Sequence, residues 1–170
     1  DPAAAADMAW RDASVSHIKN GIYGELFASC AIACAAVTDD IDEILLGGLS
    51  HIPTTSRLYA AVMAVIDKFH QGVPAEELFA DLHTRWDEHN VHDWCHTISN
   101  AEIVAACLLY GKGDYGKSIC MAVEQGFDTD CNGATIGSIL GMRGGMKAID
   151  ACWLEPLHGK LRTSIFGVDM

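Results

Sequence analysis

Apolar residues recur along most of this chain at spacings of three and four positions, which is the period of an α-helix. The clearest stripe follows Thr55 and Ser56, either of which can cap a helix, and it continues to residue 69. Segment 21–37 is apolar on nearly every side, which predicts a buried central helix. Because no stretch alternates like a strand, the pattern predicts an all-α fold. Further helices are expected over residues 2–10, 41–46, 74–82, 100–110, 114–123 and 148–153, with an irregular tail after residue 157.

Composition narrows the class of protein. The 170 residues, half of them hydrophobic, suit one domain over 1–170. A net charge of −12 argues against a nucleic-acid groove. No apolar run approaches the roughly 18 residues that a membrane span needs. The seven cysteines are odd in number and form no Cys-x-x-Cys, which favours reduced, buried thiols in a cytoplasmic protein over a disulfide framework.

The strongest chemical signal lies between residues 126 and 145. Asp128 and Asp130 stand two positions apart with no basic residue between them. Clustered carboxylates repel each other unless a positive charge compensates, and a hard divalent cation such as Mg²⁺ or Ca²⁺ commonly does so. Three glycines then recur every four residues in the expected helix, which predicts close packing of another backbone there. They are Gly133, Gly137 and Gly141.

The residues from Gly126 to Ala134 read Gly-Phe-Asp-Thr-Asp-Cys-Asn-Gly-Ala, and they resemble the late metal-binding motif of the ADP-ribosylglycohydrolase family. Arg11–His17 followed by Asn20–Gly24 is similar to a mid-chain segment of that family, and two weaker similarities follow in the right order. These two are Ile52–Leu58 and Asn100–Asp114.

The resemblance implies an orthogonal multi-helix bundle, of which this chain looks like the later half. It implies a complete site with two Mg²⁺ or Mn²⁺ ions, a catalytic residue in an N-terminal half or partner chain, and an ADP-ribosylated substrate or a similar small molecule. Cys131 stands where many members have Thr or Ser, although its backbone carbonyl remains available to a metal. The implied metal ligands are Asp128, Asp130 and Cys131, and the implied substrate-binding residues are His17, Asn20, Gly21, Asn100 and Thr129.

Several segments have a second interpretation. Asn20-Gly21 is also a signal for the end of a helix, and Gly47-Gly48 is expected to close another. Thr38-Asp39-Asp40 resembles the family's early Thr-Asp-Asp metal motif, but it lacks the closing hydroxyl residue and follows the His17 segment. We interpret it as a helix start capped by Thr38 or Asp39.

The stretch from His89 to His96 holds three histidines and Cys95, which also suggests a zinc site. Such a site needs about four ligands at defined geometry. The surrounding composition favours a loop in which His96 enters the next helix.

Two functions from different classes are compatible with this sequence. The first is a metal-dependent hydrolase that cleaves an ADP-ribosyl N- or O-glycosidic bond through an oxocarbenium-like transition state. The alternative is a non-catalytic member of the same family, which either binds ADP-ribose or a nucleotide or serves a crystallin-like structural role.

Overall fold

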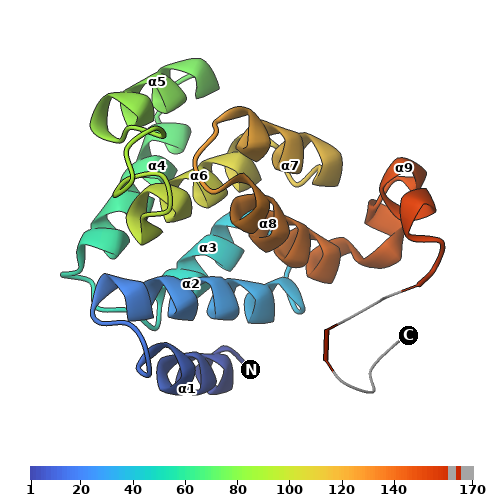
Figure 1. Cartoon of the computed structure of the whole chain (residues 1–170), viewed down its shortest axis with the longest axis horizontal. Coiled ribbons are helices and arrows are strands. Elements are labelled where there is room, and N and C mark those ends of the chain that lie inside the picture. The colour runs from blue at the N-terminus through green and yellow to red at the C-terminus, as the bar shows by residue number, and fades with distance from the viewer. Residues whose placement is uncertain (161–163, 166–170) are drawn as a thin grey trace.

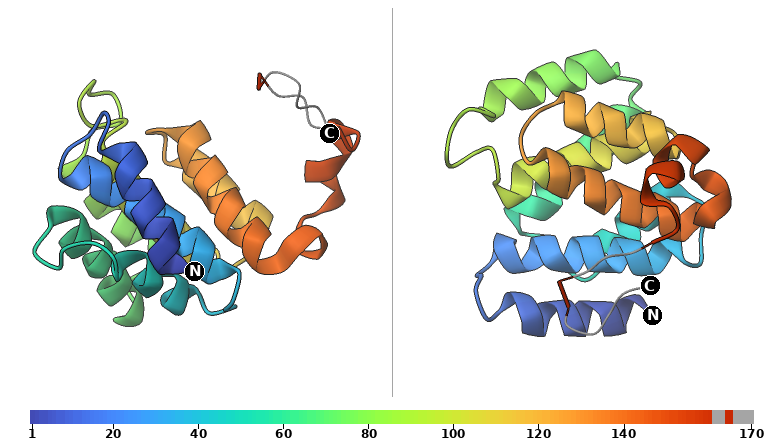
Figure 2. Two further views of the ribbon diagram at one scale, coloured as in Figure 1. Left: turned by 90° about the horizontal axis from the view of Figure 1, so that it is seen from below. Right: turned by 45° about the vertical axis from the view of Figure 1, so that its right-hand side comes forward.

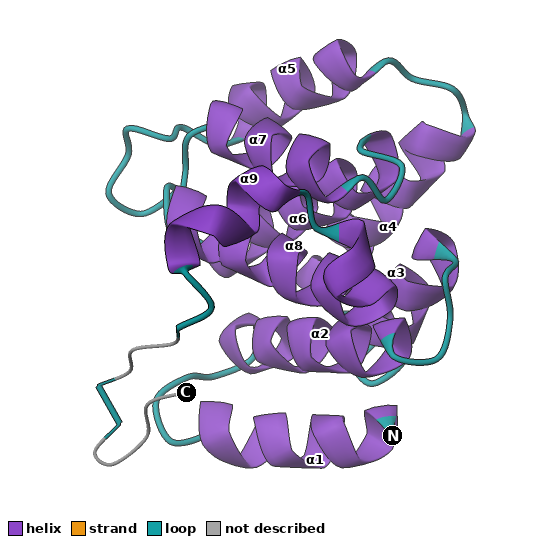
Figure 3. Cartoon of the chain, turned by 90° about the vertical axis from the view of Figure 1, so that its right-hand side faces the viewer, coloured by secondary structure: helices purple, strands orange, loops and turns teal. Residues whose placement is uncertain are grey.

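A computed structural model of the chain describes residues 1–160, 164 and 165, and these form helices and turns without a strand (Figures 1 and 3). The prediction of an all-α fold is confirmed. No helix among the described residues is both long enough and apolar enough to cross a membrane. Most of the predicted irregular tail falls on 161–163 and 166–170, outside the described residues. The elements are α1 (Pro2–Ala13), α2 (Asn20–Ala35), α3 (Ile41–Leu49), α4 (Arg57–His70), α5 (Ala75–Arg85), α6 (Thr97–Tyr110), α7 (Tyr115–Glu124), α8 (Thr129–Gly144), η1 (Gly145–Ala148), α9 (Ala151–Leu154) and η2 (Glu155–Leu157).

Helices α2 and α6 form the centre of the molecule. Most residues of α6 are buried, and α2 packs against α1, α3, α6 and α8. Figure 2 shows α1 lying along the outer side of α2, so that the two form an antiparallel pair at one edge. A helix enclosed in this way needs apolar residues around its whole circumference, and the predicted buried central helix is confirmed.

Side-chain caps define several helix starts. Ser56 accepts a hydrogen bond from the backbone N–H of Tyr59 at 3.1 Å, as predicted for the start of α4. The Thr38-Asp39-Asp40 segment is also a helix start, but the cap is Asp40 rather than Thr38 or Asp39. The Asp40 carboxylate accepts from the N–H groups of residues 42 and 43, at 2.8 and 3.3 Å. Helix α3 begins at Ile41, as expected, so Asp40 is the residue directly before it and occupies the cap position.

Two glycine signals were interpreted wrongly as helix ends. Helix α3 continues through Gly47 and Gly48 to Leu49. A Cβ at Gly48 would stand 2.8 Å from the Phe27 ring of α2. This glycine therefore allows α3 to approach α2. Asn20 begins α2 instead of ending a helix, and its side-chain oxygen accepts from the N–H of Leu58 at 3.2 Å, which ties α2 to the start of α4.

Gly133 and Gly137 of the α8 glycine stripe face α7, and the predicted close contact with another backbone is wrong for all three glycines. The nearest atoms to added Cβ groups at Gly133 and Gly137 belong to side chains of α7. A Cβ at Gly137 would lie 3.2 Å from the Tyr115 hydroxyl oxygen and 3.5 Å from Ile119. The glycines make room for bulky side chains of a neighbouring helix.

The seven cysteines are free thiols, but most of them are not buried. Cys30, Cys34 and Cys107 lie in the core, where burial raises their pKa values. The other four are exposed. These four are Cys95, Cys120, Cys131 and Cys152.

Candidate metal centre and adjoining clefts

The turn before α8 places the two carboxylates of the sequence motif. Gly126 ends the preceding helix with φ of +72°, and Phe127 follows with φ of +57°. A positive φ is uncommon for a non-glycine residue, and here the buried Phe127 side chain holds it in place. Asp128 follows at the N-cap position, directly before the first residue of α8.

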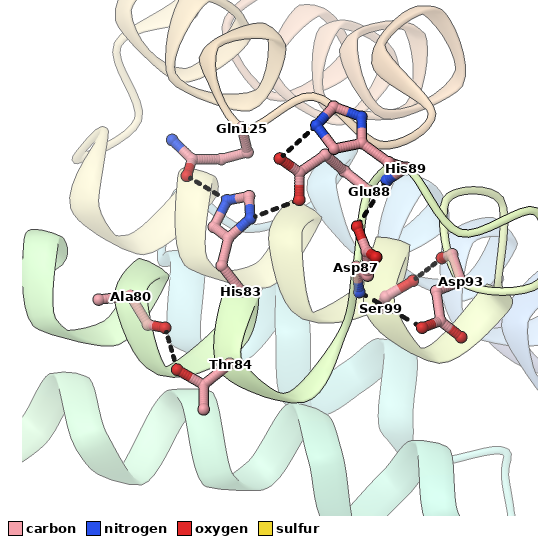
Figure 4. A network of polar contacts seen from close by, with 9 residues as sticks. All are labelled: Ala80, His83, Thr84, Asp87, Glu88, His89, Asp93, Ser99 and Gln125. Carbon is pink, nitrogen blue, oxygen red and sulfur yellow. Dashed lines mark hydrogen bonds and ion pairs between the residues drawn. The ribbon is translucent and has the colours of Figure 1, made fainter.

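A polar network supports this turn from the outside (Figure 4). The His83 ring lies between Glu88 and Gln125, at 3.0 and 3.4 Å, and it also contacts the Phe127 ring at 5.2 Å between centroids. The pKa of Glu88 is held below its usual value, chiefly by a hydrogen bond from the backbone N–H of Glu88 itself and next by one from His83. The network connects the end of α5, the loop 86–96 and the end of α7. Its members are far apart in sequence, and sequence analysis did not identify them.

Asp128, Asp130 and Cys131 form one cluster, which we call the carboxylate–thiol cluster. One potential ligand atom from each side chain lies within 4.8 Å of the others. Asp128 is half-buried, and its carboxylate accepts no capping hydrogen bond from the backbone N–H groups of α8. The Cys131 thiol donates a hydrogen bond to Asp128, and this bond is the main cause that raises the pKa of the thiol, with burial as the second cause.

One face of α8 lines a cleft of about 210 Å³, which we call the α8 cleft. The spacing of the lining residues Asp128, Cys131, Asn132 and Thr135 follows two turns of the helix. The opposite walls come from α2 and α6. Gly24 of α2 is required there, because a Cβ at this position would stand 2.2 Å from the Thr97 methyl group.

Asn100 joins the walls of the α8 cleft. Its side-chain oxygen accepts from the side-chain nitrogen of Asn132 at 2.6 Å and from the backbone N–H of Asp128 at 3.4 Å. Its side-chain nitrogen donates to the carbonyls of Trp94 and His96, both at 3.1 Å. An asparagine amide offers two donors and two acceptor sites, so these four bonds use its full capacity. Asn100 therefore positions the start of α8 relative to the loop 86–96.

A second cleft, of about 490 Å³, adjoins the first, with which it shares Cys95 and Thr97. We call it the histidine cleft. The predicted substrate-binding residues His17, Asn20 and Gly21 all line it. Of the residues that the structure describes, no Asp or Glu lines it, although the chain as a whole is strongly acidic. Its other polar and cationic side chains include Lys19, Arg57, His92 and His96.

His96 enters α6 as predicted, since its Nδ1 atom accepts from the N–H of Ile98 at 3.1 Å. The Trp86 ring stacks on the His96 ring at 5.0 Å, and the Trp86 indole N–H donates to Glu102 at 2.8 Å. Glu102 is 1% exposed and also pairs with Arg85 at 2.8 Å. The buried carboxylate of Glu102, which sequence analysis missed, therefore holds Trp86 against the cleft residue His96.

The remaining candidates lie elsewhere. Thr129 lines neither cleft, and Asp12 lies next to Glu25, whose pKa is raised by burial and then by the Asp12 carboxylate. Asp39 lies at the other end of α8, where its carbonyl accepts from Arg143 at 2.8 Å. Arg143, which holds Asp39, is fifteen residues after Asp128 along α8. At 1.5 Å per helical residue, the Thr38-Asp39-Asp40 segment therefore lies about 22 Å along α8 from the cluster.

The loop predicted from His89 to His96 is confirmed, since the segment contains turns and no helix. Four of its residues, Val91, His92, Cys95 and His96, line the histidine cleft. Among the described residues, the carboxylate–thiol cluster is the one group of three His, Cys, Asp or Glu side chains close enough to hold one ion.

Comparison with known families decides the ancestry of this arrangement. The sequence model of the ADP-ribosylglycohydrolase family matches residues 1–168. The chain belongs to the ADP-ribosylglycohydrolase family. Neither the curated proteins nor the solved structures give a significant match.

The donor set of the carboxylate–thiol cluster fits a divalent cation. Carboxylate oxygens are the preferred protein ligands of Mg²⁺, which one or two of them commonly hold together with water. Asp128 and Asp130 supply that number, whereas two ions would need further oxygen ligands. Thr135 and Thr97 also contribute to the α8 cleft and were missed from the sequence, although Thr135 follows Asp128 at helical spacing.

Proposed function

We propose that this protein is a divalent-metal-dependent hydrolase of an ADP-ribosyl N- or O-glycosidic bond, with Asp128 and Asp130 as metal ligands. The observation that carries the proposal is the place of the carboxylate–thiol cluster. Two of its three members, Asp128 and Cys131, line the α8 cleft, and this cleft adjoins the histidine cleft. Membership of the ADP-ribosylglycohydrolase family supports the class of reaction.

The two clefts suit different parts of such a substrate. A bound cation can orient ribose hydroxyls and lower the pKa of a water molecule. In the histidine cleft, Lys19 and Arg57 offer positive charge without a competing carboxylate, which suits the pyrophosphate of ADP-ribose. Asn100 holds the start of α8 in place, so that Asp128 keeps its position beside the α8 cleft.

The proposal includes a partner segment. Within the described residues, Asp128 is the one carboxylate that lines either cleft, so these clefts lack a separate acid to protonate a leaving group. We therefore propose that an N-terminal half of the same protein, or a partner chain, contributes the catalytic acid and the remaining ligands of a second Mg²⁺ or Mn²⁺.

The test is release of ADP-ribose from an ADP-ribosylated peptide by the chain together with that segment. Activity should require Mg²⁺ or Mn²⁺, disappear with a chelator, and disappear in the D128N/D130N double variant. Asp39→Asn is the matched control, because Asp39 is exposed and lies at the far end of α8. Unchanged turnover in the double variant would sink the assignment.

A non-catalytic binding role is the second candidate, and the same absence of a separate carboxylate in the described clefts favours it. Calorimetry with ADP-ribose separates the two. Metal-dependent binding without turnover by the complete protein supports a binder. Absence of both metal and ligand binding supports a structural, crystallin-like role.

A further inference from the structure

Cys131 is the member of the cluster that suits Mg²⁺ least. Mg²⁺ is a hard cation that takes oxygen ligands, whereas thiolate sulfur is a soft ligand that favours ions such as Zn²⁺. The Cys131 sulfur nevertheless lies within 4.8 Å of an oxygen atom from each of Asp128 and Asp130. Any ion that both carboxylates hold is therefore brought close to this sulfur.

The backbone carbonyl of Cys131 does not provide an oxygen in its place. Helix α8 runs from Thr129 to Gly144, so Cys131 lies in its first turn. In an α-helix, the carbonyl of residue 131 points along the axis and accepts from the N–H of residue 135. The expectation from sequence that this carbonyl remains available to a metal is therefore not supported by the helix. The side chain, by contrast, faces the α8 cleft.

The dimensions of the cluster fit one ion. Zinc lies about 2.3 Å from sulfur and about 2.0–2.2 Å from carboxylate oxygen, so the ligand atoms of a tetrahedral site lie roughly 3.5 Å apart. The potential ligand atoms of the cluster all lie within 4.8 Å of one another, so side-chain rotations that move them by about 1 Å bring them to that range. Cys95, a second exposed thiol, lines the same cleft.

We propose that the carboxylate–thiol cluster binds a thiophilic divalent cation of the Zn²⁺ and Co²⁺ class in preference to Mg²⁺, with the Cys131 sulfur as one ligand. Binding forms one sulfur–metal bond and releases the thiol proton to solvent, with no change in oxidation state. The inference rests on the proposed function insofar as both concern one metal site, but it changes the identity of the ion.

The test is a titration of the metal-free full chain with Co²⁺, followed by absorption. A cobalt–thiolate bond gives a charge-transfer band in the near ultraviolet, whereas cobalt held by oxygen alone does not. The band should appear as Co²⁺ binds, disappear when Zn²⁺ is added, and persist in a large excess of Mg²⁺.

Matched variants assign the sulfur. Cys131→Ser should remove the band and weaken Zn²⁺ binding by at least about 10-fold. Loss of a residue that only hydrogen-bonds to a metal ligand already costs about 10-fold or more, so loss of a ligand should cost at least that much. Cys95→Ser, which changes the other exposed thiol of the cleft, should keep the band. Asp128→Asn should weaken binding of every cation. Circular dichroism checks that each variant is folded.

The outcomes separate this inference from the proposed function. Cobalt binding without a charge-transfer band, or a band that Cys95→Ser removes and Cys131→Ser keeps, overturns the inference and leaves the hydrolase proposal in place. Tighter binding of Mg²⁺ than of Zn²⁺ likewise overturns the inference and leaves the hydrolase proposal in place. If no cation binds to the complete protein, both proposals fail.

Discussion

The hydrogen bonds of Asn100 make a quantitative prediction about how the candidate site is held together. Asn100→Leu keeps a side chain of similar size but removes all four bonds of the amide. It also leaves the side-chain amide of Asn132, which is 2% exposed, without its partner. The variant therefore tests whether this one residue fixes the start of α8.

The expected loss of stability is large for a half-buried position. A hydrogen bond contributes about 0.5–1.5 kcal/mol net, and a buried group left without a partner costs about 1–3 kcal/mol. Since the bond to the Asp128 N–H is long at 3.4 Å, we count it as weak. The sum for Asn100→Leu is about 3–5 kcal/mol, or a fall in Tm of about 6–20 °C at 2–4 °C per kcal/mol.

Urea unfolding followed by circular dichroism measures this loss, and a double-mutant cycle identifies its origin. Asn132→Leu alone leaves the Asn100 oxygen with only the long bond, so each single variant includes a penalty for an unpaired group. The N100L/N132L double variant removes both partners, and it should be less destabilised than the sum by at least about 1 kcal/mol.

The control is Asn90→Ala. Asn90 is exposed and accepts a single bond from the N–H of His92 at 2.8 Å, so its loss should cost less than about 1.5 kcal/mol. Two results would refute the reasoning: additivity of the Asn100 and Asn132 variants within about 0.5 kcal/mol, or a cost for Asn100→Leu no larger than that of the control.

Three further predictions concern other parts of the fold. Gly24→Ala places a methyl group 2.2 Å from the Thr97 methyl and should destabilise the chain by about 1–3 kcal/mol in urea unfolding, with partial rescue by Thr97→Ser. Glu102→Gln removes the buried charge that pairs with the partly exposed Arg85, and it should cost about 1–3 kcal/mol by the same measurement. The hydrogen bond from Lys68 lowers the pKa of Asp81, so the stability from this pair is present above the ordinary pKa of about 4 and is lost as pH falls further. Asp81→Asn should make stability less dependent on pH in that acidic range, and an unchanged acid profile would contradict the assignment.

Helix periodicity predicted the fold well because most helices bury one face. The Ser56 cap was visible from residue type alone, and it is confirmed. The errors at Gly48 and Asn20 share a cause. Glycine and asparagine mark turns, but they also serve where two helices approach closely or where one helix caps another. Those uses depend on tertiary neighbours that the local sequence does not contain.

The candidate site was predictable where it is local. Asp128, Asp130 and Cys131 lie within one turn, so their proximity follows from the sequence. The clefts combine distant segments: Gly24 comes from α2, Thr97 from the start of α6 and His92 from the loop before it. The resemblance pointed to Asn100, His17 and Asn20, but it could not reveal that the Asn100 amide is fully bonded within the protein.

Two acidic segments of this chain show why paired carboxylates do not by themselves identify a metal site. Asp40 and Asp128 both stand directly before the first residue of a helix, at the N-cap position. The extended backbone of Asp40, with φ of −81° and ψ of 119°, lets its carboxylate fold back onto two N–H groups of α3.

Asp128 has a ψ of 74° and makes no such bond. The two preceding residues, Gly126 and Phe127, both have positive φ, and this turn delivers Asp128 to α8 in a different orientation. A carboxylate that caps its own helix has given its oxygens to backbone N–H groups, whereas one that does not cap keeps them for a cation. The conformation of the turn at 126–127, rather than the number of acids, therefore distinguishes the candidate metal site from the helix cap.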